Sequence, residues 1–363
     1  MSESISTHHG GFDAGYFRAM GRSYDPALDF SVNINPWRPA NAFLSRLRRV
    51  DYGAYPDPQN TLVREAVAHA VGVHAGEVIV DAGSSRILWS LVRAVLCRGA
   101  SAVVVDPTFG EFHRAVAAQG GVLHRVWRND TPEGWKLDVE KVSERITAVR
   151  AQMVYICDPN NPTGEILDPA ILPHLAQKHP DCIFVWDEAY RFLTHHPHRR
   201  AQDLPSNVVR LQSLTKEQGV PGLRIGYAVM DEALADRVHA QRPAWCCGNA
   251  EAEGIRAALD GRAALDKDLN AWFLERKQMV AAAHDQGFTV QYADAPWFLI
   301  RGIRPTVFRD AAVRDAGLLM RDCTSFGIAD AVRVCPRLPA ANAQWMAWMR
   351  AQNAADWRRI ESL

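Results

Sequence analysis

Residues 213–227 read SLTKEQGVPGLRIGY and place a lysine and an arginine on either side of a Pro-Gly turn. Lys216 follows small and hydroxyl residues, and Arg224 stands eight residues further on. Because Pro and Gly favour a tight turn, we expect the chain to bring the arginine back toward the lysine. The segment predicts a site in which an amine and a guanidinium act together.

Short apolar runs flank this segment and recur through the middle of the chain. They are EVIVDAG (77–83), SAVVVDPTFG (101–110), GVLHRVW (121–127), AQMVYICDPNNPTG (151–164), DCIFVWDEAY (181–190), NVVRLQSLTK (207–216) and RIGYAVM (224–230). Runs rich in Val and Ile with little polar alternation are typical of strands buried on both faces, as in a mostly parallel sheet. Helical stretches such as SRILWSLVRAVL lie between them, and this alternation predicts an α/β fold.

The pattern changes near residue 250. Long helical stretches come first, and three short strand-like pieces follow them, FTVQYAD (288–294), WFLIRG (297–302) and AVRVCPR (331–337). This order predicts a smaller α+β lobe. We expect residues 51–248 to form a large domain and residues 249–363 a small one, with residues 1–50 packing against the small domain.

Composition and charge restrict the class of protein. The chain has 363 residues, 48% of them hydrophobic, and its 41 Lys and Arg balance its 41 Asp and Glu, so the formal net charge is zero. This balance argues against a nucleic-acid binder, which needs a basic surface. The N-terminus has no apolar run, no stretch is long enough to cross a bilayer, and the seven scattered cysteines form no CxxC pair. We expect a cytoplasmic protein with free thiols and with neither a nucleic acid nor a membrane as partner.

Polar and aromatic residues follow the predicted strands at the points where these end. In chain order they are Ser84, Ser85, Phe109, Asn161, Asp187, Tyr190 and Lys216. In an open α/β sheet, ligands bind at the carboxyl ends of the strands. Together these side chains fit one ligand that has a phosphate, an aromatic ring and an electrophilic carbon.

The motifs NNPTG (160–164), DEAY (187–190) and SLTK…PGLRIGY, in this order, resemble those of the class I/II aminotransferases of pyridoxal-phosphate fold type I. The resemblance covers nearly the whole chain, whereas no GxGxxG follows a strand to support a dinucleotide fold. It implies a mostly parallel seven-stranded sheet in a large domain, a smaller α+β domain and pyridoxal 5'-phosphate as cofactor. It also implies a homodimer with shared active sites, acting on a small-molecule amino-acid substrate.

The same resemblance implies roles around the cofactor ring. Lys216 forms the Schiff base, for which its amine has to be neutral. Asp187 pairs with the pyridine nitrogen and keeps it protonated, which makes the ring an electron sink. Tyr190 and Asn161 hydrogen-bond the ring oxygen, and Phe109 stacks on the ring, although a phenylalanine there also fits a core position.

A second set of residues is implied for the cofactor phosphate. It consists of Ser84, Ser85, Ser213, Thr215 and Arg224. A guanidinium and a helix N-terminus both suit an anion, although the Gly-Ser-Ser turn taken alone fits an ordinary helix cap equally well. Tyr55 in GAYPD resembles a tyrosine that reaches the phosphate bound by the partner subunit.

Four residues are implied on the substrate side. Arg333 matches the arginine that binds a substrate carboxylate, and Arg321 matches a second arginine that holds a substrate phosphate in some members. An ordinary surface salt bridge is the alternative for Arg321. His9 in HHGGF and Asn33 in LDFSVNINP resemble residues near the substrate, and a free terminal histidine is the alternative for His9.

Two branches of the family compete, the threonine-phosphate decarboxylases and the histidinol-phosphate aminotransferases. The HHGGF and LDFSVNINP motifs favour the first, so we expect an enzyme that acts at Cα and resembles L-threonine-O-3-phosphate decarboxylase. Arg86 and Trp297 stand where the family usually has an acidic residue and an asparagine. These departures suggest a changed substrate in a specialised biosynthesis, and they leave elimination, substitution and carbon-carbon bond formation open.

Two other classes of protein receive little support. A regulator with an inactive domain of this fold carries a DNA-binding domain, for which the chain has no residues, and Lys216 is present. A metal enzyme is suggested by His195, His196 and His198 in THHPHRR, but that stretch contains no carboxylate. We expect solvated histidines and no metal site.

Overall fold

The computed structural model describes residues 10–196 and 204–358. A seven-stranded sheet with the order β1-β9-β8-β7-β6-β2-β3 forms the centre of the larger lobe. Its strands are β1 (Val78–Asp81), β2 (Ser101–Asp106), β3 (Val122–Trp127), β6 (Met153–Cys157), β7 (Ile183–Asp187), β8 (Val208–Ser213) and β9 (Gly226–Val229). Only β9 runs antiparallel to its neighbours within this sheet. The prediction of a mostly parallel seven-stranded sheet is therefore confirmed.

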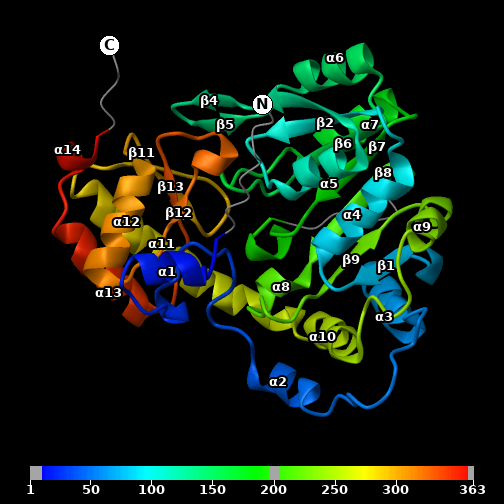
Figure 1. Cartoon of the computed structure of the whole chain (residues 1–363), viewed down its shortest axis with the longest axis horizontal. Helices are drawn as coiled ribbons and strands as arrows, with labels where there is room; N and C mark the ends of the chain where they lie inside the picture. The colour runs from blue at the N-terminus through cyan, green and yellow to red at the C-terminus, as the bar shows by residue number, and fades with distance from the viewer. Residues whose placement is uncertain (1–9, 197–203, 359–363) are drawn as a thin grey trace.

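Helices cover both faces of this sheet, as the apolar runs predicted. One face packs against α4 (Ser84–Val95), α5 (Glu111–Gln119) and α9 (Glu232–His239), and the other against α6 (Val139–Val149) and α7 (Ile171–Lys178). Strand β2 shows the alternation, because Val104 belongs to the first apolar cluster and Val103 to the second. Figure 1 shows these helices around the strands.

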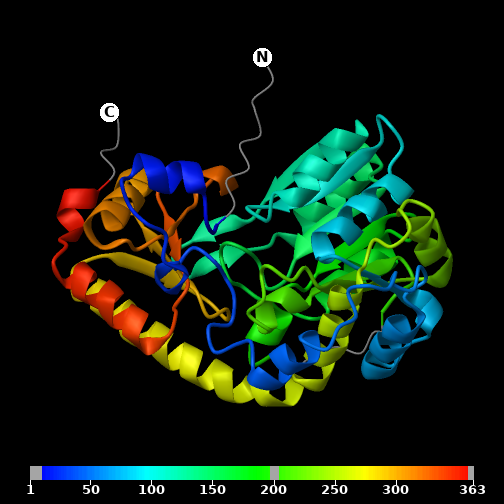
Figure 2. The ribbon, with the colours of Figure 1, turned by 60° about the horizontal axis from the view of Figure 1, so that its bottom comes forward.

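The C-terminal part of the chain builds a second, antiparallel sheet with the order β10-β11-β13-β12. Its strands are β10 (Thr289–Tyr292), β11 (Phe298–Arg301), β12 (Arg321–Asp322) and β13 (Val332–Val334). The helices α11 (Leu265–His284), α12 (Pro305–Ala316) and α13 (Pro339–Arg350) bury an apolar cluster against it. Phe30 is part of that cluster, so the N-terminal segment packs on this sheet. Figure 2 shows α11, in yellow, running from one lobe to the other.

The remaining elements are short or peripheral. They are α1 (Ala14–Ala19), α2 (Asn41–Leu47), α3 (Thr61–Val71), β4 (Asn129–Thr131), β5 (Gly134–Lys136), α8 (Leu214–Glu217), α10 (Asn249–Asp260) and α14 (Ala354–Trp357). None of the helices in the described part of the chain is long and apolar enough to cross a membrane. The predicted domain boundaries at residues 51 and 249 stay a prediction.

The packing of α4 on the large sheet predicts the effect of one core substitution. Leu88 of α4 is fully buried, and Leu88→Ala should lower the free energy of unfolding by about 2–5 kcal/mol, because it leaves a cavity. The same change at Leu62, which is 66% exposed, should cost less than about 0.5 kcal/mol. Urea unfolding of the two variants, followed by circular dichroism, measures both; equal losses would contradict the assigned burial.

Candidate active site

The carboxyl ends of β6, β7 and β8 bring the main predicted residues to one edge of the large sheet. Asn161 follows β6, Asp187 ends β7, and Lys216 lies in α8 directly after β8. The N-terminal segment reaches the same place, because the backbone N–H of Asn35 donates to the carbonyl of Lys216 at 2.9 Å. The edge therefore brings together side chains from three separate parts of the sequence and the backbone of a fourth.

Lys216 lies among cations and is only partly exposed. Burial, together with the guanidinium groups of Arg224 and Arg333, lowers the pKa of Lys216 to about 8, and the carboxylate of Asp187 opposes the shift. Since the pKa lies near neutrality, a sizeable fraction of the amine is uncharged at physiological pH. An uncharged amine is what attack on a carbonyl carbon requires.

Asp187 is the carboxylate of this edge. It is 4% exposed, and burial raises its pKa to about 6. Its Oδ2 accepts from the hydroxyl of Tyr155 at 2.5 Å, and its Oδ1 accepts from the backbone N–H of Ala189 at 3.0 Å. Among the described residues Asp187 forms no salt bridge, although the charge of Lys216 acts on it, so a protonated ring nitrogen would be a fitting partner for this buried carboxylate. Tyr155, in the middle of an apolar run, was missed by the sequence analysis.

Asn161 links Tyr190 to Arg333. Its Nδ2 donates to the hydroxyl of Tyr190 at 3.3 Å, while its Oδ1 accepts from Nη1 of Arg333. The other terminal nitrogen of Arg333 donates to the carbonyl of Ser31 at 2.5 Å. These contacts hold the guanidinium, 4% exposed as a residue, between the large lobe and the N-terminal segment.

Arg321 lies opposite Arg333 on the neighbouring strand, and within the described residues neither forms an ion pair with a carboxylate. Burial and the charge of Arg333 lower the pKa of Arg321 to about 10. Asn33 is 2% exposed, and neither polar atom of its side chain has a hydrogen-bond partner among residues 10–196 and 204–358. Arg333 donates to Asn161 and Ser31, and Nη2 of Arg321 donates to the hydroxyl of Ser325 at 2.7 Å, so both guanidinium groups have neutral partners but no counter-charge among the described residues. Buried positive charge without a counter-charge is costly unless an anion compensates it. The group favours a negatively charged substrate.

Arg224 lies against the N-terminus of α4, where a phosphate would bind. Gly83 has a φ of +92°, and a Cβ placed on it would lie 3.1 Å from Nη2 of Arg224. Helix α4 begins at Ser84 without a side-chain cap, so its first N–H groups stay available for an anion. Thr215 was expected to donate to the phosphate, but its hydroxyl donates to the carbonyl of Ile225 at 3.2 Å. It thus holds the segment that carries Arg224.

The remaining predicted residues lie as follows. Ser85 follows Ser84 in the first turn of α4, Ser213 is buried at the end of β8, and Phe109 is partly buried between β2 and α5. Tyr55 is 84% exposed, and its ring lies 5.0 Å from that of Trp245. His9 lies outside the described residues. The roles assigned to all of them stay predictions.

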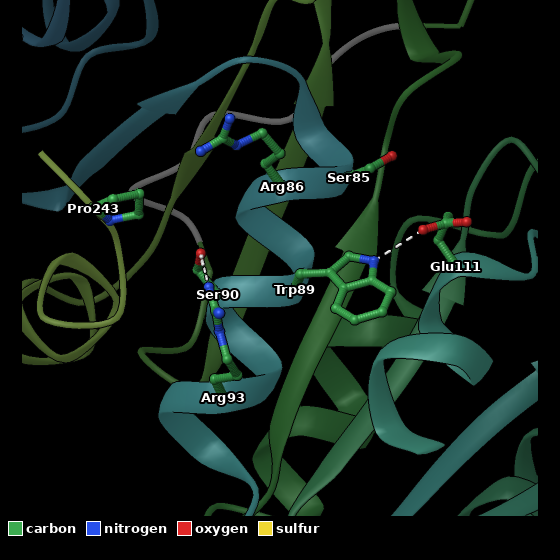
Figure 3. Close-up of a pocket in the computed structure, with 7 residues that line it drawn as sticks. All are labelled: Ser85, Arg86, Trp89, Ser90, Arg93, Glu111 and Pro243. Carbon is green, nitrogen blue, oxygen red and sulfur yellow. Dashed lines mark hydrogen bonds between the residues drawn. The ribbon is translucent and has the colours of Figure 1, made fainter. Parts of the chain in front are cut away.

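Arg86 has a partner that the sequence did not reveal. Its Nε lies 3.2 Å from Oδ1 of the buried Asp81, whose other oxygen lies 3.0 Å from Nε of Arg242. Arg86 also lines a cavity of about 320 Å³ beside α4, next to Ser85 and Trp89 (Figure 3). Its position therefore has a structural explanation, because it compensates a buried carboxylate beneath the Gly-Ser-Ser turn.

Two histidines of THHPHRR, His195 and His196, lie in the described residues, and each contacts a side chain that is not among the predicted site residues. Nε2 of His196 is 2.9 Å from Oδ1 of Asp294, and the ring of His195 packs on Phe273 at 4.9 Å. His198 lies outside the described residues. Among residues 10–196 and 204–358, no group of three or more His, Cys, Asp or Glu side chains could hold a metal ion.

Known proteins share both the sequence pattern and the architecture. The family described as aminotransferase class I and II matches residues 26–346. A histidinol-phosphate aminotransferase of Roseiflexus castenholzii is 29% identical to this chain, and the alignment covers 89% of each protein. A threonine-phosphate decarboxylase of Salmonella typhimurium is 28% identical, and the alignment covers 95% of this chain and 96% of that protein. A crystal structure of histidinol-phosphate aminotransferase from Sinorhizobium meliloti with pyridoxal-5'-phosphate aligns with a TM-score of 0.85 over 96% of each chain, at 22% identity. The match confirms the predicted family and fold.

The contact between Arg224 and α4 depends on a second glycine. A Cβ on Gly226 would lie 2.6 Å from the backbone nitrogen of Ser84 and 2.8 Å from the carbonyl of Gln212. Gly226→Ala should displace the turn and weaken retention of pyridoxal phosphate at least about tenfold, which equilibrium dialysis measures. Gly222→Ala is the matched control, because nothing lies within 4 Å of that Cβ. Equal affinity of the two variants would count against the turn as the phosphate site.

Proposed function

This chain belongs to the class I and II aminotransferases, which use pyridoxal phosphate, and on that premise we propose that it acts at Cα of an amino acid carrying a phosphate. The observation that carries the proposal is the pair Arg321 and Arg333, two buried guanidinium groups opposite each other without a carboxylate partner among the described residues. Two adjacent cationic groups suit a substrate with two anionic groups.

The chain's own residues fit the cofactor. Lys216 offers an amine with a lowered pKa, and Asp187 offers a buried carboxylate with no salt bridge in the described part of the chain. Arg224 and the open N-terminus of α4 offer a phosphate site at the same edge. When bound, the cofactor supplies an electron sink for the bond that breaks at Cα.

The two arginines would then determine which bond at Cα of the substrate breaks. Arg333 would hold the substrate carboxylate by its guanidinium, and Arg321 would hold the second anionic group, so together they would orient the bonds at Cα. If that orientation favours cleavage of the bond to the carboxylate, carbon dioxide would leave. If it favours cleavage of the bond to the Cα hydrogen, Lys216 in its uncharged form would accept the proton at Nζ.

Decarboxylation of a threonine-phosphate-like substrate is the first candidate. Such a substrate carries both a carboxylate and a phosphate, which matches the two arginines, and the HHGGF and LDFSVNINP motifs resemble that branch. Transamination of the histidinol-phosphate type is the second, supported by the relative from Roseiflexus castenholzii. Elimination, substitution and carbon-carbon bond formation need the same Lys216 and stay alternatives.

We propose a cytoplasmic homodimer as the working form. All seven cysteines lie in the described residues as free thiols, which suits a reducing compartment. Tyr55 and Trp245 expose an adjacent pair of aromatic rings, and large exposed apolar groups of this kind are typical of surfaces that a second copy covers.

A substrate panel tests the reaction and the role of Arg321 together. With L-threonine phosphate, carbon dioxide should be released while the cofactor spectrum is regained after each turnover. Arg321→Gln should raise KM for this substrate about 10- to 100-fold, because a charged hydrogen bond to the phosphate is lost, while the exposed Arg350→Gln should leave it unchanged. Conversion of the cofactor to its amine form, reversed only by a keto acid, would favour transamination instead.

The pKa of Lys216 predicts how fast the cofactor-free protein takes up pyridoxal phosphate. The uncharged amine reacts, and its fraction grows with pH up to the pKa of about 8. The rate followed by stopped-flow absorbance should therefore rise about tenfold per pH unit below pH 8 and level off above it. A rate that keeps rising to pH 10 would show that the amine has an ordinary pKa.

A further inference from the structure

Trp297 connects the C-terminal sheet with the Asn160–Gly164 loop of the large lobe. The residue is 1% exposed and directly precedes β11. Its indole N–H donates to the carbonyl of Pro162 at 2.8 Å. The backbone adds a second bond two residues earlier, where the N–H of Ala295 donates to the carbonyl of Gly164 at 3.2 Å. The loop is thus held at two points.

The same loop carries Asn161, whose amide contacts Arg333 on one side and Tyr190 on the other. Trp297 also contacts Tyr190 directly, with the rings edge to face at 4.9 Å and 69°. An edge-to-face pair at this distance is attractive and fixes the orientation of both rings. The indole therefore restrains Pro162, which follows Asn161 in the chain, and Tyr190, to which Asn161 donates.

These contacts form a closed ring that begins and ends at the segment Trp297–Leu299. Leu299 of β11 pairs with Arg333 of β13, Arg333 donates to Asn161, and the neighbouring Pro162 accepts from Trp297, two residues before Leu299. The pairing of β11 with β13 and the hydrogen bond of the indole to Pro162 together set the position of the Arg333 guanidinium relative to the amide of Asn161. Loss of that bond leaves the loop free to move against the sheet.

We propose that Trp297 is a positioning residue that aims Arg333 at the substrate carboxylate through Pro162 and Asn161. This role rests on the proposed function, in which Arg333 binds a carboxylate. A side chain without an N–H at this point cannot hold the carbonyl of Pro162, and a smaller one cannot also reach the ring of Tyr190. Trp297 stands where the family usually has an asparagine, and the indole makes both the hydrogen bond to Pro162 and the ring contact with Tyr190, which an asparagine has no ring to make.

Binding of maleate, an unreactive dicarboxylate, tests the role without knowledge of the natural substrate. The protein loaded with pyridoxal phosphate is titrated, and the change in its visible absorption gives Kd. Trp297→Phe keeps an aromatic ring but removes the N–H, and we expect it to raise the Kd for maleate about five- to tenfold, as the loss of one buried hydrogen bond does. Retention of the cofactor on gel filtration should stay as in the wild type.

Trp348→Phe is the matched control. Trp348 is also buried, at 8% exposed, its N–H lies 3.3 Å from Oδ2 of Asp315, and its ring packs edge to face on Phe308, away from the site. We expect this variant to lower the melting temperature to a similar degree and to leave the Kd for maleate unchanged.

The outcomes separate the two proposals. If the wild type binds maleate and Trp297→Phe binds it equally well, the indole is only a packing residue and the positioning role is overturned. The same holds if Trp348→Phe weakens binding as much, because a general loss of stability then explains both. If the wild type does not bind maleate at millimolar concentration, the proposed function itself fails, and the positioning role fails with it.

Discussion

The crowding of positive charge at one edge of the sheet is the constraint on which this site depends. Lys216, Arg224 and Arg333 lie close enough to affect one another electrostatically, and Arg321 adds a fourth cation opposite Arg333. The carboxylate of Asp187 is the group that opposes these charges at Lys216. Like charges that are partly removed from water repel strongly, so such a cluster is tolerable only if the fold is stable enough to carry it. The surrounding buried strands supply that stability.

The same constraint explains what the site selects. In the proposed function, a phosphate near Arg224 and two anionic groups near Arg321 and Arg333 would each remove part of the repulsion, so the cluster favours anionic ligands. The pKa of Lys216 then depends on which anions are bound, because each anion nearby favours the protonated form of the amine. The reactivity of the amine is therefore tied to which anions are in place.

The sequence predicted the sheet well, and it also indicated the edge at which Asn161, Asp187 and Lys216 lie, because both leave local signals. Val- and Ile-rich runs mark buried strands wherever they occur, and Asn161, Asp187 and Lys216 each follow such a run. The contacts of Tyr155, Arg86 and Trp297 could not be predicted in this way. Tyr155 binds Asp187, 32 residues later, and Trp297 binds Pro162, 135 residues earlier. Arg86 pairs with Asp81 of the preceding strand. Local sequence patterns do not reveal such contacts, which form only when the chain folds.

The N-terminal segment has a consequence for the order in which the protein is made. Ser31 holds Arg333, which is 302 positions later in the chain, and Asn35 bonds to the backbone of Lys216. A ribosome releases Ser31 long before it has synthesised either partner. Ser31 must therefore wait until Arg333 has been synthesised, and its segment can dock against β13 only after that strand has been translated. Until then a nascent chain can already possess its large sheet and yet have no finished place for a substrate.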